Sequence, residues 1–210
     1  MSLRNKSILL ILAILFIDQV VKVWIKTHMT IGDEYHILGN WFIIHFTENN
    51  GMAFGIEFWG KSGKLFLSLF RIVAIGVIGY FIYQLIQQKA KTGLVLGISA
   101  IMAGAIGNLI DSAFYGLIFS DSMVQLAKFL PEGGGYSSFL HGRVVDMLYF
   151  PIINTTYPEW IPWVGGQHFI FFSPVFNFAD SAITTGVFYL LIFQRKVLLG
   201  NIDEKLTVAE

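Results

Sequence analysis

The chain alternates between long apolar runs and shorter polar connections. Four of the runs are about 20 residues long, which is the length a helix needs to cross the hydrocarbon core of a membrane. They cover about residues 7–25, 65–86, 94–118 and 169–193. The pattern predicts an integral membrane protein that is mainly α-helical, with four transmembrane helices and one polytopic membrane domain over residues 1–210.

The first and last runs carry signals at their ends. The first follows Arg4 and Lys6 and lacks a small-residue cleavage site, so we expect a retained anchor rather than a removed signal peptide. We expect the last helix to begin near Pro174, because proline suits a first helical turn and Ser173 suits the N-cap. Asp180 then falls within the outer two turns of that helix.

Lysine and arginine are concentrated in the short polar segments. These segments precede the first run, link the second to the third and follow the fourth, and together they contain Arg4, Lys6, Lys89, Lys91, Arg195, Lys196 and Lys205. Short segments rich in such residues stay in the cytoplasm. Both termini are therefore predicted to be cytoplasmic, with the connections at about residues 27–64 and 119–168 outside.

The two outer connections differ in pattern. Residues 35–46 form two aromatic-rich runs separated by Gly39 and Asn40, which predicts a β-hairpin and a small β-rich region on the membrane surface. In the second connection, residues 131–138 are rich in glycine and favour a flexible, non-helical segment. Prolines and aromatic residues between 149 and 163 predict an irregular stretch at the membrane interface.

Composition narrows the chemistry. The chain is 55% hydrophobic and 13% charged, its formal net charge is +0, and it has no cysteine. A neutral chain has no basic surface for nucleic acid, so no nucleic-acid partner is expected. Membrane lipid is an expected partner. Without cysteine there is no disulfide, no thiolate nucleophile and no thiolate metal ligand.

Asp146 and Asp180 are the main candidates for chemistry. A carboxylate near hydrocarbon is costly and usually faces a protein interior or a watery cavity. Two adjacent carboxyl groups cannot both ionise cheaply, so one can act as an acid and the other as a base toward water. An aspartic peptidase needs this arrangement. A proton-coupled carrier could use the same residues, but it predicts inverted repeats or broken helices, and a structural scaffold would not need carboxylates at the outer edge.

Further polar residues lie at helical spacing. Asn177 precedes Asp180 by three residues, and Asn108 precedes Asp111 by three. Asn108 could hold helices together or contact substrate, and Asp111 could support a local network or take part in the site. Close helix approach is predicted beside them by the small residues Ala100, Gly104 and Gly107.

Three other sets of residues have candidate roles. Asp18 and Lys22 are spaced for an ion pair that either belongs to the site or only settles helix packing. No metal site is expected, because the histidines lack metal-ligand spacing. Residues 133–135 follow no strand and precede no helix, which makes a phosphate-binding loop improbable.

The chain resembles the signal peptidase II family of bacterial inner-membrane aspartic peptidases, which process lipoproteins. Five ordered motifs carry the resemblance: residues 18–22, 48–55, 104–111, 144–146 and 176–180. The resemblance implies that Asp146 and Asp180 are the catalytic pair. It implies that the site is shaped, or substrate held, by Asp18, Lys22, Asn49, Gly51, Asn108, Asp111 and Asn177.

The resemblance also implies partners and location. The expected substrates are prolipoproteins, cleaved before a cysteine that carries diacylglycerol, and the expected inhibitors are globomycin-type peptides. No metal or organic cofactor is expected. We expect a monomer whose active site lies near the outer (periplasmic) face of the membrane.

The chain departs from the family pattern in two places. The family usually has arginine directly after the third-run aspartate, where this chain has Ser112, and Arg143 is the candidate substitute. Residues 119–139 form an insertion where most members have a short link. This inserted segment could be a lid, a partner surface or an element without function, and its glycines predict mobility.

Overall fold

The computed structural model describes residues 1–50, 60–171 and 174–195. The chain divides into two compact units, which are described separately. The helical unit contains Met1–Val20, Leu65–Ile110 and Phe178–Glu210, and the sheet unit contains Val21–Lys64 and Asp111–Asn177. The boundary between the units falls inside the first helix.

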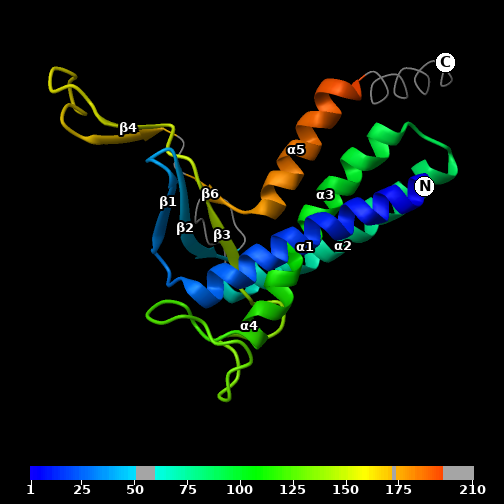
Figure 1. The fold of residues 1–210 in the computed structure, drawn as a ribbon, viewed down its shortest axis with the longest axis horizontal. Helices are drawn as coiled ribbons and strands as arrows, with labels where there is room; N and C mark the ends of the chain where they lie inside the picture. Colours follow the sequence, from blue (N-terminus) through cyan, green and yellow to red (C-terminus); the bar gives the residue numbers. More distant parts are fainter. Residues whose placement is uncertain (51–59, 172–173, 196–210) are drawn as a thin grey trace. The chain divides into compact units, whose positions relative to one another are not determined.

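Three helical segments within the described ranges are long and apolar enough to cross a membrane. They are α1 (Leu3–His28), α2 (Gly60–Gln87) and a segment made of α3 (Thr92–Ile110), the π-helical η2 (Asp111–Tyr115) and α4 (Gly116–Ile118) (Figure 1). These helices confirm the first three predicted runs. The fourth, α5 (Phe178–Phe193), is apolar but has only 16 residues, so four spans remain a prediction.

Two helix predictions need correction. The last helix begins at Phe178 rather than near Pro174, because Val175 and Phe176 pair as a strand with Tyr149 and Leu148. Ser173, the predicted N-cap, lies outside the described residues. The third run is not one continuous α-helix, since its backbone widens into a π-turn at Asp111.

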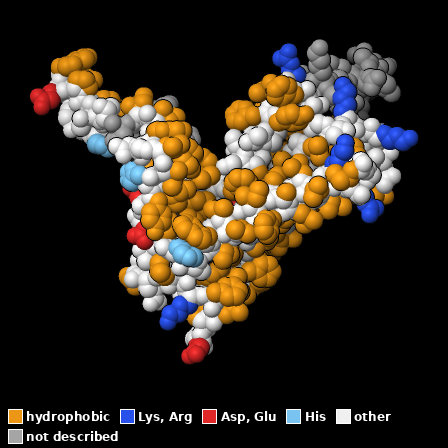
Figure 2. All heavy atoms as spheres, in the orientation of Figure 1, with side chains coloured by type: hydrophobic (Ala, Val, Ile, Leu, Met, Phe, Trp, Pro, Cys, Tyr) orange, Lys and Arg blue, Asp and Glu red, His pale blue; other side chains and the backbone are white. Residues whose placement is uncertain are grey.

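The surfaces of α1 and α2 are apolar, as lipid-facing helices require. Large exposed hydrophobic residues on them include Leu9, Leu12, Phe16, Phe66, Phe70, Val73 and Val77. Figure 2 shows Lys and Arg side chains gathered at the end of the helical unit where the chain starts. That end carries the first residues of α1 and the link between α2 and α3.

Small residues allow α3 and α5 to pack closely in the helical unit. A Cβ at Gly104 would collide with the backbone carbonyl of Ala179, and a Cβ at Gly107 would lie 3.1 Å from the Ala179 side chain. The predicted close approach beside these two glycines is therefore confirmed. A neighbouring apolar core contains Ile82, Leu85, Leu94, Val95, Ile98 and Leu190.

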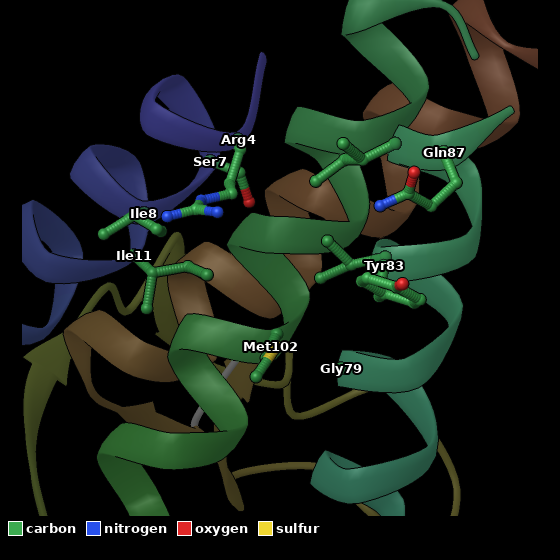
Figure 3. A pocket seen from close by; sticks show the side chains of 10 residues that line it. Arg4, Ser7, Ile8, Ile11, Gly79, Tyr83, Gln87 and Met102 are labelled. Carbon is green, nitrogen blue, oxygen red and sulfur yellow. The ribbon is translucent and has the colours of Figure 1, made fainter. Parts of the chain in front are cut away.

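A separate cavity of about 250 Å³ lies among α1, α2 and α3 (Figure 3). Its walls are mostly apolar, from residues such as Ile8 and Met102, and Arg4 and Gln87 border it. None of the predicted site residues lines this cavity.

The sheet unit is built on four antiparallel strands in the order β1-β2-β3-β6. Their bounds are Glu34–Leu38, Phe42–Asn49, Val144–Tyr149 and Val175–Phe176 (Figure 1). The predicted hairpin between residues 35 and 46 is confirmed as β1 and β2. In register, Thr47 faces Asp146 and Asn49 faces Val144.

The second outer connection contains more regular structure than its sequence indicated. Besides β3, it holds a hairpin of β4 (Ile153–Thr156) and β5 (His168–Phe171). The expectation of an irregular stretch is therefore wrong at β4 and holds for the turns between the two strands. Prolines interrupt the apolar alternation here, and the two strands form by pairing with each other across the connection between them.

Candidate active site

Asp146 is held by two asparagine amides, one at the end of β2 and one directly after β6. It lies in the middle of β3 and is only 3% exposed. Asn177 Nδ2 donates to Oδ1 over 2.8 Å, and Asn49 Nδ2 donates to Oδ2. Asn49 reaches Asp146 diagonally across the β2–β3 pair, where side chains of one face come together. All three residues were predicted for the site, and the structure brings them together.

Asp180 is held in the helical unit. It lies in the first turn of α5, where the partial positive charge of a helix N-terminus favours a carboxylate. Asn108 Nδ2, from α3, donates to Asp180 Oδ1 over 2.7 Å. Asn108 therefore contacts one of the predicted catalytic carboxylates, in addition to lying where α3 and α5 pack.

Asp18 supports the start of the same helix. Its Oδ1 accepts the backbone N–H of Ala179 over 2.9 Å. Ala179 lies in the first turn of α5, where backbone N–H groups have no acceptor within the helix. Gln19 Nε2 donates to Asp18 Oδ2 over 3.0 Å. Gly107 leaves the room for this contact, since a Cβ there would lie 2.7 Å from Asp18 Oδ2. Asp18 thus fixes the helical turn that carries Asp180.

Lys22 and Asp111 form an ion pair in the sheet unit. Lys22 Nζ lies 2.8 Å from Asp111 Oδ2, and neither side chain is exposed. The same oxygen accepts the backbone N–H of Val145 over 3.2 Å. Asp111 therefore holds the β3 residue next to Asp146, which agrees with the local network considered for it. The predicted pairing of Lys22 with Asp18 stays a prediction.

Arg143 is the predicted substitute for the family arginine that is absent at Ser112. The N–H of Gly142 donates to the carbonyl oxygen of Ser112 over 2.8 Å. Arg143 directly follows Gly142 in the chain, so its backbone lies near Ser112. Its guanidinium pairs with Glu48 over 3.1 Å and with Asp121. Burial lowers the pKa of Arg143, but these carboxylates outweigh burial and raise the pKa above its ordinary value.

Sequence reasoning missed four residues beside Arg143: Lys26, Glu48, Asp121 and Tyr136. Lys26 is fully buried in the last turn of α1. The position of Glu48 could have been predicted from strand alternation, which places its side chain on the face opposite that of its neighbour Asn49. Nothing in the sequence links Asp121 or Tyr136 to this place. Gly51, the remaining predicted site residue, lies outside the described residues.

The predicted site residues described above present carboxylates and amides. Across the described ranges, no three His, Asp or Glu side chains gather as a metal site would require. Asp146 has an amide donor on each oxygen and Asp180 has one on Oδ1, which suits groups that exchange protons with water or a peptide.

Comparison with known proteins gives consistent matches. The family model for signal peptidase II matches residues 10–195. A lipoprotein signal peptidase of Porphyromonas gingivalis (strain ATCC 33277) is 50% identical over 202 residues, covering 96% of this chain and 88% of the relative. One of Amoebophilus asiaticus (strain 5a2) is 39% identical, covering 85% of this chain and 73% of the relative.

A solved structure agrees with the fold. A bacterial membrane enzyme superposes with a TM-score of 0.57 at 28% sequence identity, over 90% of this chain and 91% of that one. The apolar helices and the amide-held carboxylates define the class as a membrane-embedded enzyme. Within that class, the chain belongs to the signal peptidase II family. The family membership confirms the sequence resemblance and leaves the carrier alternative without support.

Proposed function

We propose that the chain removes the signal peptide from diacylglyceryl-modified prolipoproteins, cutting before the lipid-modified cysteine. The observation that carries this proposal is that Asp146 and Asp180 are each held by asparagine amides, in a chain of this family. Relatives that match most of the chain are named lipoprotein signal peptidases. Prolipoproteins are therefore the proposed substrates and globomycin-type peptides the proposed inhibitors.

Asp146 and Asp180 are the proposed catalytic residues. Chain connectivity supports their pairing: Asn177 donates to Asp146, and Asp180 follows Asn177 by three residues. Three residues span at most about 11 Å. Both carboxylates are therefore proposed to act on one bound peptide.

The two aspartates have different proposed roles. Asp146 accepts hydrogen bonds from amides at both oxygens, and such donors favour a charged carboxylate. It is the proposed base that takes a proton from the attacking water. Asp180 is the proposed acid toward the scissile carbonyl oxygen, and the roles reverse when the amine leaves. General acid–base help contributes about 10²–10⁴-fold. Positioning and electrostatic stabilisation supply the rest.

The remaining site residues act through these two. Asn49, Asn108 and Asn177 orient the carboxylates, while Asp18 and the Lys22–Asp111 pair hold the elements that carry them. Arg143 supplies the positive charge that the family has directly after the third-run aspartate, supported by the Gly142 bond to Ser112. Gly51 stays in the proposed site on the family motif alone.

The proposed setting is the bacterial cytoplasmic membrane. We propose that α5 completes a fourth span, so that both termini are cytoplasmic, and that a monomer works with its site near the outer face. Lys and Arg at one end of the helical unit support this orientation, because such residues mark the cytoplasmic side.

Cleavage of a diacylglyceryl-modified lipobox peptide by purified protein in detergent tests the function. Wild type should release the signal peptide, and Asp146→Asn and Asp180→Asn should each abolish cleavage while remaining folded. Glu132→Gln, at an exposed residue, is the same kind of change outside the pair and serves as the control. Substantial turnover by either catalytic-pair variant would disprove the assignment.

A further inference from the structure

Four charged side chains cluster in the sheet unit next to the strands that hold Asp146. This charge cluster consists of Lys26, Glu48, Asp121 and Arg143. Lys26 and Glu48 form an ion pair with neither side chain exposed. Arg143 lies 3.1 Å from the second Glu48 oxygen and also pairs with Asp121. Buried ions are stable only with well-placed partners, so the buried Lys26–Glu48 pair has a defined geometry, and Arg143 joins it to the more exposed Asp121.

The inserted segment, residues 119–139, encloses this cluster. It supplies Asp121, and its Ser122 Oγ accepts a hydrogen bond from Lys26 Nζ over 2.8 Å. The Phe119 and Tyr136 rings lie with their centroids 5.4 and 5.1 Å from Lys26 Nζ. Aromatic faces attract desolvated cations at these distances.

Tyr136 also holds Arg143. Its ring centroid lies 4.4 Å from Arg143 Cζ, and its hydroxyl oxygen accepts the Arg143 backbone N–H over 2.7 Å. Burial raises the pKa of Tyr136 well above its ordinary value, so the hydroxyl stays neutral. The inserted segment therefore contacts both the guanidinium and the backbone at the residue that leads into β3.

Backbone hydrogen bonds anchor the inserted segment to its surroundings. The Ala127 N–H donates to the Lys26 carbonyl and the Ile31 N–H to the Ser122 carbonyl, each over 3.0 Å. The Tyr136 N–H donates to the Phe119 carbonyl over 3.0 Å. Gly135 is required at this point, because a Cβ there would collide with the backbone of α4. These contacts describe a packed element.

Sheet register connects the cluster to Asp146. Glu48 faces Val145, while Asn49 faces Val144 and lies diagonal to Asp146. Since side chains alternate between faces, Glu48 projects from one face of β2 and Asn49 from the other. The charge cluster therefore fixes, from one face, the two strands whose opposite face carries the Asn49–Asp146 contact.

We propose that the inserted segment is a positioning element of the peptidase, which holds β2 and β3 so that Asn49 and Asp146 stay in register. Asp121 and Tyr136 are its positioning residues, acting through Arg143 and Glu48. The inference rests on the proposed function, because the register matters for catalysis only if Asp146 is catalytic.

Kinetics on the full chain, with the lipobox peptide as substrate, test this role. Asp121→Asn should lower kcat by on the order of tenfold or more with KM unchanged, since small misplacements of reacting groups are costly. Asp121→Glu should recover most of the rate. Glu132→Gln is the matched control, because Glu132 is exposed in the same segment, and it should behave as wild type.

Tyr136→Phe is a second, milder variant. It keeps the ring and removes only the acceptor for the Arg143 N–H, so a smaller fall in kcat with KM unchanged is expected. A raised KM with unchanged kcat in either variant would overturn the proposal in favour of a substrate-facing lid. Equal kinetics for Asp121→Asn and Glu132→Gln would also overturn it.

The outcome for Asp146→Asn separates a failure of the positioning role from a failure of the proposed function. If wild type cleaves and Asp146→Asn does not, a normal Asp121→Asn refutes only the role of the inserted segment. If wild type does not cleave, or Asp146→Asn cleaves normally, the proposed function fails and the positioning role fails with it.

Discussion

Replacing Asn177 by alanine removes one donor from Asp146. Asn177 is fully buried, and its amide donates to Asp146 Oδ1 over 2.8 Å. A hydrogen bond to a charged group contributes about 1.5–3 kcal/mol. If that stabilisation is lost from the transition state, kcat/KM should fall roughly 10- to 150-fold. Asn49 still donates to the other oxygen, so activity should be reduced rather than abolished.

The assay is cleavage of the lipobox peptide across a range of pH. Besides the lower rate, we expect the acid limb of the kcat/KM profile to move to higher pH, because a carboxylate that loses a donor is protonated more easily. Asn40→Ala, at the exposed turn between β1 and β2, is the matched control and should leave the rate and the profile unchanged.

Unfolding in detergent separates this effect from misfolding. The rate comparison holds only for variant protein that unfolds cooperatively near the wild-type temperature. Folded Asn177→Ala with the wild-type rate and the wild-type acid limb would refute the role of Asn177 as a donor to a catalytic carboxylate.

Three further predictions concern a buried ion pair, the packing at Gly107 and the pH dependence of stability. Lys22→Met leaves Asp111 buried without its cation and should destabilise the fold by about 3–5 kcal/mol, measured by thermal unfolding. Gly107→Ala should cost about 1–3 kcal/mol and slow cleavage. Its control Gly76→Ala, with nothing within 4 Å of the new Cβ, should be neutral or stabilising. Burial raises the pKa of Asp121, but bonds from Arg143 and the Met123 N–H outweigh it, so the folded pKa lies below the ordinary value. Asp121 therefore adds stability above its ordinary pKa and loses it as pH falls through the lowered one. The stability difference between wild type and Asp121→Asn should shrink in acid.

Local sequence determined the elements whose stability is local. Long apolar runs satisfy their backbone hydrogen bonds within a helix, so α1, α2 and α3 could be located from hydropathy alone. The hairpin of β1 and β2 followed from strand alternation around Gly39 and Asn40. Candidate site residues were found because a carboxylate or amide is costly in apolar surroundings and so stands out in an apolar chain.

Tertiary structure decided what depends on partners distant in sequence. The later start of α5 follows from the pairing of β6 with β3, and the pairing of Lys22 with Asp111 joins residues 89 positions apart. Only the folded chain shows that Gly135 of the inserted segment allows a close backbone contact with α4. Residue types indicated which groups could do chemistry. Their hydrogen-bond partners could not be predicted, because electrostatic and packing energies depend on distances that only the folded chain sets.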